Sequence, residues 1–191
     1  MLLTPFYDPE KTYEENYKKG PFGAFAQGFG NPKGVFASED EDRPKFDFLG
    51  FKVNSPFGIP AGPLINGNFM KAAFNKGFDI CVYKTVRTRA KKANEWPNIL
   101  PVNVEGDLTL EKARQGLTTK KQFTEPLAIT NSFGNPSYDP KIWQADIALI
   151  MKHSDDLKGQ VVCGMIEGTR WSPDFTKQDF LNDWVLAARL M

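Results

Sequence analysis

The segment Asp79–Val86, DICVYKTV, decides the fold of this chain. Its residues are almost uniformly apolar before Lys84, without the alternation of polar and apolar positions that marks a strand with one face in water. Such a run is typical of a parallel strand that is covered on both faces by helices. The segment therefore predicts a parallel sheet, with Lys84 at the carboxyl-terminal end of one strand.

On both sides of this segment, strand-like and helix-like segments alternate. Before it come a strand-like segment with a turn at Gly50 (48–55), a short apolar strand (56–63) and a helix (66–78) closing near Gly77. After it come a loop-rich insert of about 35 residues, a strand that begins as buried sheet (127–134), a helix with Ile142 and Leu149 among its apolar positions (139–154), a strand (160–168) and a helix (174–191). Alternating strands and helices favour a parallel α/β fold, either doubly wound or a (β/α)8 barrel. The barrel is preferred, because neither GxGxxG nor GxxxxGK[ST] follows any strand.

The chain is short for a complete barrel, which typically needs about 250 residues. Of its 191 residues, 1–47 are rich in Gly, Phe and charge and are interpreted as an N-terminal extension with a short helix within Pro9–Lys19. Residues 48–191 supply three convincing core strands. We therefore expect the first half of a (β/α)8 TIM barrel, in a protein that continues past Met191.

The composition excludes several classes of function. Lys and Arg (24) nearly balance Asp and Glu (23), which gives no electrostatic argument for nucleic acid binding. No membrane span or signal peptide is visible, so we expect a cytoplasmic protein. Cys81 and Cys163 are interpreted as small buried residues. With His153 as the single histidine, interpreted as structural, no metal site is proposed.

Three features could carry chemistry, and each also has a structural interpretation. Lys84 could bind an anion or form a Schiff base, or it could be a barrel salt bridge or an end-of-strand lysine that reaches water. Pro60–Pro63, PAGP, lets a flat ligand lie on backbone, or is an ordinary turn. Asn131 in NSFGNP offers a donor and an acceptor to a ring edge, or begins an Asx turn. The run Val86–Lys92, VRTRAKK, is interpreted as a solvated loop, in which one arginine could still face the site.

Taken together, NSPFGIPAGP (54–63), VYKTV (82–86) and ITNSFGNPS (129–137) resemble the N-terminal half of the FMN-dependent dihydroorotate dehydrogenase family. The pyrimidine-reducing domain of dihydropyrimidine dehydrogenase is similar. The resemblance implies a (β/α)8 barrel that binds FMN and a dihydropyrimidine and oxidises dihydroorotate or a related dihydropyrimidine in pyrimidine biosynthesis. It is also compatible with a homodimer. It also implies that the catalytic base is a Cys or Ser that lies beyond Met191. Neither Cys81 nor Cys163 matches this base. The isolated chain is therefore expected to be inactive.

The resemblance assigns a role to each matching position. Pro60, Ala61 and Gly62 would pack their backbone against the flavin ring, while Lys84 and Thr85 would contact flavin and substrate, with Lys84 as the catalytic residue. The substrate wall would consist of Asn131, Ser132, Phe133, Gly134 and Asn135. Two alternatives remain open: a Schiff-base aldolase on the same fold that uses Lys84, and a half-barrel that serves only as an interaction module.

Overall fold

The segment that decides the fold forms the central strand of a three-stranded parallel sheet. In the computed structural model, which describes residues 5–26, 45–125, 127–152 and 159–191, the sheet has the order β3 (Gly58–Ile59), β4 (Ile80–Val82) and β7 (Val161–Cys163). Both partners of β4 run parallel to it, with Cys81 opposite Ile59 on one side and Val162 on the other. The predicted parallel α/β arrangement is thus confirmed, as an open sheet.

Three of the helices that the sequence predicts accompany this sheet; the first of them packs on β4 and on the second. They are α3 (Gly67–Asn75), α5 (Pro140–Lys152) and α6 (Lys177–Leu190). α3 begins at its N-cap Asn66 and buries a full apolar face that includes Phe69, Met70 and Ala73. In α5 only Trp143 is fully buried, while two of the predicted apolar positions, Ile142 and Leu149, are about half exposed at 46% and 57%. The outer side of α5 is therefore an apolar surface.

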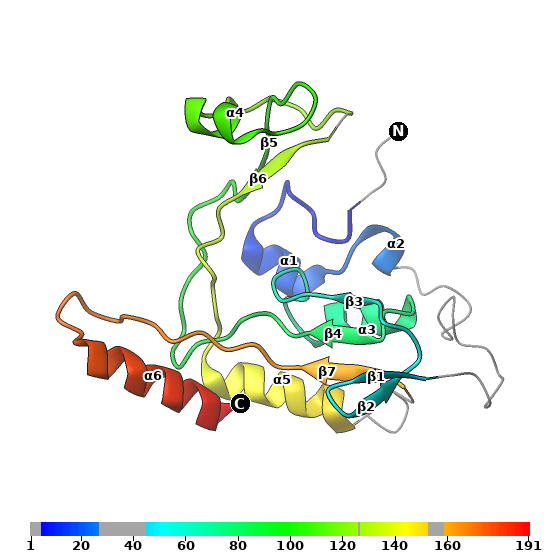
Figure 1. The fold of residues 1–191 in the computed structure, drawn as a ribbon, viewed down its shortest axis with the longest axis vertical. Coiled ribbons are helices and arrows are strands. Elements are labelled where there is room, and N and C mark those ends of the chain that lie inside the picture. Colours follow the sequence, from blue (N-terminus) through cyan, green and yellow to red (C-terminus); the bar gives the residue numbers. More distant parts are fainter. Residues whose placement is uncertain (1–4, 27–44, 126, 153–158) are drawn as a thin grey trace.

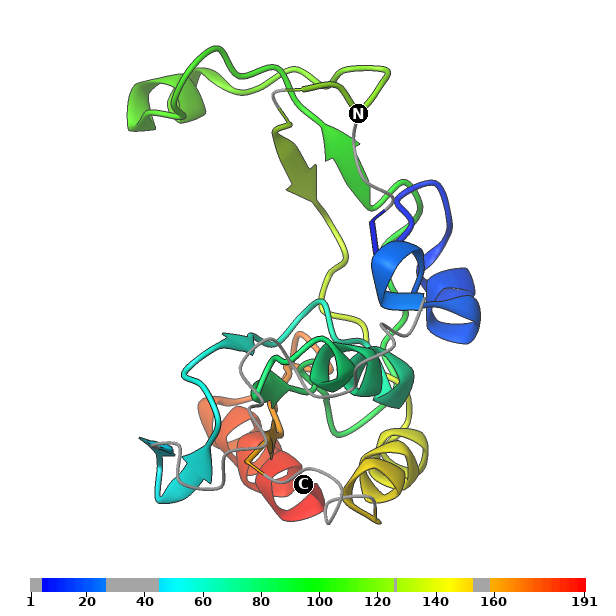
Figure 2. The ribbon, with the colours of Figure 1, turned by 90° about the vertical axis from the view of Figure 1, so that its right-hand side faces the viewer.

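The first described residues pack on this body. α1 (Tyr13–Lys19) lies within the predicted helix and starts later, at the Thr12–Glu15 capping box; α2 (Gly23–Ala26) follows it. The strands β1 (Phe46–Phe48) and β2 (Phe51–Val53) form an antiparallel pair around the predicted turn at Gly50, and β1 begins two residues before the predicted strand-like segment. Figures 1 and 2 both place α1 and α2 beside α3. The division of the chain at residue 47 stays a prediction.

A long arm projects from the body between β4 and α5 (Figures 1 and 2). It carries β5 (Ile99–Pro101), α4 (Leu110–Gln115) and β6 (Ile129–Asn131), and β5 pairs with β6 antiparallel. The prediction that residues 127–134 begin as buried sheet is wrong, since all three residues of β6 are exposed. Both edges of β4 are already occupied by β3 and β7, so β6 takes its hydrogen bonds from β5 in the insert. The insert is accordingly more structured than the loop that the sequence indicates.

No helix in the described parts of the chain is long and apolar enough to cross a bilayer.

Asp146 joins three elements of the body. Its carboxylate accepts one hydrogen bond from the Gly67 amide at the start of α3 and one from the Tyr83 hydroxyl after β4, both at 2.7 Å. Asp146→Ala leaves both donors without their acceptor, and we expect it to lower the free energy of unfolding by about 2 kcal/mol. Urea denaturation measures this. Lys141→Ala, at an exposed position of the same helix, is the control, and a loss at Asp146 no larger than at Lys141 would contradict the assignment.

Candidate functional site

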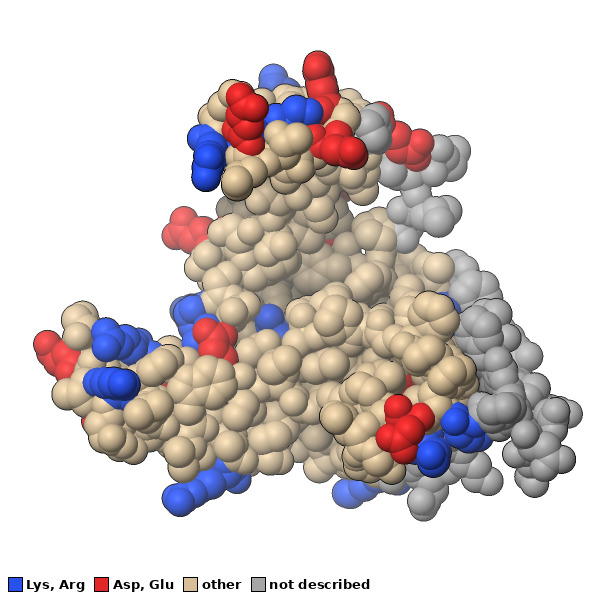
Figure 3. All heavy atoms as spheres, in the orientation of Figure 1, with Lys and Arg blue, Asp and Glu red and all other residues tan. Residues whose placement is uncertain are grey.

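A cavity of about 570 Å³ opens where the arm overhangs the body. This volume lies within the range of small-molecule sites. Figure 3 shows the hollow between arm and body, with most charged side chains at the periphery of the molecule. The cavity is lined by the loop after β3, the end of β4, the arm and the N-terminal segment: Pro5, Phe6, Tyr7, Tyr13, Ala61, Gly62, Pro63, Ile65, Lys84, Ile99, Ile129, Asn131, Phe133, Gly134 and Asn135.

Most of the residues that the sequence singles out meet in this cavity. Those that line it are Ala61, Gly62, Lys84, Asn131, Phe133, Gly134 and Asn135. Three others do not line it. Thr85 borders a gap of only about 10 Å³ beside Lys84, Pro60 lies outside both spaces, and Ser132 bonds the insert through its backbone and hydroxyl groups to Asn98 and Asn94. The roles of all these residues remain predictions.

One side of the cavity is bare backbone. Gly62 has a φ of +128°, a conformation that side chains rarely adopt, and a Cβ atom built on it would meet nothing within 4 Å. With Ala61 beside it, this segment presents peptide groups and almost no side-chain bulk. A planar ring could therefore lie directly against it.

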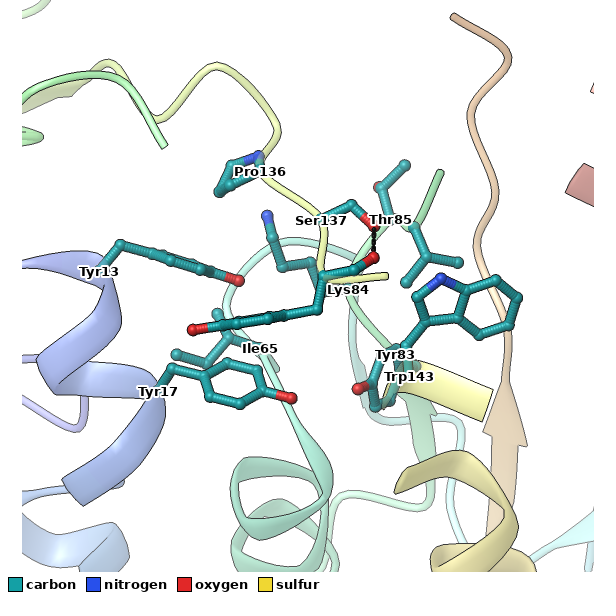
Figure 4. Close-up of a pocket in the computed structure, with 11 residues that line it drawn as sticks. Tyr13, Tyr17, Ile65, Tyr83, Lys84, Thr85, Pro136, Ser137 and Trp143 are labelled. Carbon is teal, nitrogen blue, oxygen red and sulfur yellow. Dashed lines mark hydrogen bonds between the residues drawn. The ribbon is translucent and has the colours of Figure 1, made fainter. Parts of the chain in front are cut away.

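Lys84 is the cation of the cavity. Its backbone N–H donates to Leu64 O at 2.9 Å, and the residue is only 6% exposed. Burial lowers the pKa of its ammonium group to about 8, and Arg87 adds to this effect, while Glu167 opposes it. Within the described residues Lys84 forms no salt bridge, so its interpretation as part of a barrel salt bridge is not what is observed. Figure 4 shows its side chain extending from the end of β4 toward Tyr13.

Arg87 holds the part of the cavity wall that contains Asn135. It is 4% exposed, so the prediction that Val86–Lys92 is a solvated loop is wrong at this position. Its guanidinium group donates to Asn135 O at 3.0 Å and pairs with Glu167 at 2.9 Å, and the Asn135 side chain donates to the same carboxylate at 3.1 Å. Asn135 has a φ of +47°, in the left-handed region that asparagine adopts more readily than most residues.

The pairing of Arg87 with Glu167 follows from the register of the parallel strands. Val86 and Ile166 form a parallel bridge beyond the ends of β4 and β7, so Arg87 and Glu167 follow at equivalent positions of neighbouring strands. Opposite charges at equivalent positions indicate a pair. The sequence alone does not reveal this register.

The N-terminal segment supplies aromatic lining of the cavity that was not predicted from the sequence. The ring of Tyr7 meets that of Phe133 edge-on, at 5.4 Å between centroids. The Tyr7 hydroxyl is the one buried side-chain polar atom, among the described residues, that has no hydrogen-bond partner. The closely spaced aromatic residues in Phe6–Tyr17 are the only sequence signal of this role.

The cysteines are poor nucleophiles. Both are free; Cys81 is buried, and burial raises its pKa to about 12. Cys163 is only partly buried, so the prediction of burial is wrong for this residue. Its partial burial still raises its pKa, which disfavours the thiolate. Within the described ranges no three His, Cys, Asp or Glu side chains are grouped to hold a metal ion, and His153 lies outside those ranges.

We expect Arg87→Gln to loosen the wall of the cavity. The substitution removes the pair with Glu167 and the bond to Asn135 O, so backbone amides in residues 131–137 should exchange with deuterium about tenfold faster or more. Arg89→Gln is the matched control, because Arg89 is exposed and its guanidinium lies over Trp171. Equal exchange in both variants would show that Arg87 does not hold this wall.

The buried ammonium predicts a pH-dependent stability difference. Folded Lys84 loses its proton near pH 8, whereas the unfolded chain keeps it to about pH 10.4, so wild-type stability rises with pH between these values. Without ligand, Lys84→Met should therefore be more stable than wild type by on the order of 2 kcal/mol at pH 7, and this gain should disappear by about pH 10. Chemical denaturation across this pH range measures it. Lys71→Met, at an exposed position of α3, should show no such trend.

The chain is similar to a known dihydroorotate dehydrogenase. No family model matches the chain. It is 38% identical to a dihydroorotate dehydrogenase of Dictyostelium discoideum, over 97% of this chain. The chain spans about half the length of that relative, 49%, and corresponds to its N-terminal half. This chain is therefore similar to the N-terminal half of a dihydroorotate dehydrogenase.

Proposed function

We propose that this chain forms the N-terminal half of an FMN-dependent dihydroorotate dehydrogenase that works in pyrimidine biosynthesis. The observation that carries the proposal is the meeting of bare backbone at Ala61–Gly62, the buried cation Lys84 and the amide of Asn131 in one cavity. These three features suit a planar cofactor, an anionic substrate group and a ring edge with donors and acceptors. The relationship to the Dictyostelium protein gives independent support.

We also propose that the open sheet is part of a (β/α)8 barrel. Within the described residues, β3 and β7 each pair with only one neighbour, and both are edge strands. The helix α6 exposes several large apolar side chains: Leu181, Trp184, Val185 and Leu186. Unpaired strand edges and apolar helix faces are what a barrel would cover with further strands and helices.

The residues present fit a flavin ring. Gly62 presents backbone without a side chain, and both it and the cation Lys84 line the cavity. Ala61 and Gly62 would lie against the ring, and Lys84 would contact its edge. The bound flavin would supply the acceptor for two electrons.

The protein side chains would bind and orient the dihydropyrimidine. Its oxidation removes a hydride from C6 and a proton from C5, so the ring must be held with C6 toward the acceptor. Lys84 would attract the substrate carboxylate and stabilise negative charge. Asn131 can donate to a ring carbonyl and accept from a ring N–H with one amide. The proton acceptor is expected outside this chain.

A Schiff-base aldolase is the second candidate, and one observation favours it. A lysine whose pKa is lowered to about 8 has an appreciable neutral fraction near physiological pH, as a nucleophilic amine requires. Sodium borohydride would trap a carbonyl substrate on Lys84 in that case. A protein with bound flavin that fails to trap any carbonyl compound would exclude it.

The direct experiment uses the protein expressed from the complete reading frame that contains this chain. We expect it to be yellow, to release FMN on denaturation, and to lose its flavin colour when dihydroorotate is added without oxygen. Lys84→Ala and Asn131→Ala should each slow this reduction by about 100-fold or more. Lys71→Ala, on the exposed side of α3, is the control. A colourless protein, or one whose flavin dihydroorotate does not reduce, would refute the proposal.

A further inference from the structure

The N-terminal segment is docked on the body at defined points. The Asn66 side chain at the start of α3 donates to Tyr17 O at 2.7 Å, near the end of α1. Gly20 lies so close to the Phe69 ring that an added Cβ atom would approach it to 2.5 Å. The fully buried Asn16 ties α1 back to Asp8 through two hydrogen bonds of 2.8 and 2.9 Å. These contacts fix the position of α1 beside the cavity.

This docking places Tyr13 against Lys84. Tyr13 is 3% exposed, and the Lys84 ammonium lies 5.6 Å from the centre of its ring (Figure 4). Neighbouring rings hold it: Phe133 meets it edge-on at 6.3 Å, and Tyr138 stacks at 6.5 Å. The electron-rich face of an aromatic ring attracts a cation at this distance.

We propose that Tyr13 is a positioning residue for Lys84: its ring receives the ammonium group and so keeps a cation at the cavity wall for an anionic ligand. The contact itself does not depend on the proposed function. The inference rests on that function for the identity of the anion, the substrate carboxylate.

The surroundings of Lys84 make this contact valuable. Burial and Arg87 both disfavour its charged form, and Glu167, which favours it, already pairs with Arg87. The hydroxyl groups around the same gap, on Tyr13, Tyr17, Tyr83 and Tyr138, have raised pKa values because they are buried, so they stay neutral and supply no negative charge. Among the described residues, the Tyr13 ring therefore gives the ammonium group a direct stabilising contact, at 5.6 Å from its centre.

Competitive labelling with acetic anhydride tests the contact without any ligand. The reactivity of Lys84 as a function of pH, followed by mass spectrometry of its peptide, gives its pKa. In Tyr13→Leu this pKa should fall by about one unit, whereas Tyr13→Phe, which keeps the ring face, should lose less than half of that. Phe25→Leu is the matched control, since Phe25 belongs to the same segment, packs on Phe6 and Phe78, and does not line the cavity.

A series of fluorinated rings covers the case in which Tyr13→Leu does not fold. Phenylalanine with one, two or three ring fluorines at position 13 keeps the shape but weakens the negative ring face. The pKa of Lys84 should fall stepwise along the series. A pKa that stays constant, or that rises in Tyr13→Leu as water enters, would overturn the inference and leave Tyr13 as a steric wall.

A second readout connects the contact with binding. In the flavin-containing protein, orotate affinity should decline above a pH set by Lys84, and Tyr13→Leu should move this decline to lower pH by the same shift. A Lys84 shift without orotate binding would refute the proposed function and leave the Tyr13 inference intact. Orotate binding with an unchanged pH profile would refute the inference alone.

Discussion

The burial of one ammonium group at the end of β4 is the constraint on which the site depends. A lysine that is 6% exposed and without a salt bridge in the described residues is costly in an isolated domain. An anion bound beside Lys84 would offset this cost, because it restores a favourable interaction of the ammonium group that burial removes. Ligand binding and the charge of Lys84 are then coupled, and the neighbouring groups act mainly through this coupling.

The parts of the fold that local pattern determines were predictable from sequence. The uniformly apolar Ile80–Val82 and the helical spacing around Phe69 lead directly to β4 and α3. The position of β6 was not predictable, because a short apolar run such as Leu127–Ile129 fits a buried strand and an exposed hairpin equally well. Which one forms depends on whether β4 has a free edge, and that depends on residues far away in the chain.

The residues of the site were also predictable only where the local sequence is unusual. Lys84 and Asn131 stand out in the sequence because a cation in an apolar strand and an amide before a helix are locally unusual. Arg87 did not stand out, since its burial follows from a partner, Glu167, that lies 80 positions later and meets it only through the sheet register. The contact of Tyr13 with Lys84 was not predictable for the same reason. It depends on how α1 docks on the body, and no local sequence pattern indicates that docking.

The most direct measurement is a crystal structure of the protein from the complete reading frame with orotate bound. The account predicts the orotate carboxylate within about 4 Å of Lys84 Nζ, the usual salt-bridge distance, and the pyrimidine edge on the Asn131 amide. Orotate bound with its carboxylate on other residues, and Lys84 turned away from it, would contradict the central claim.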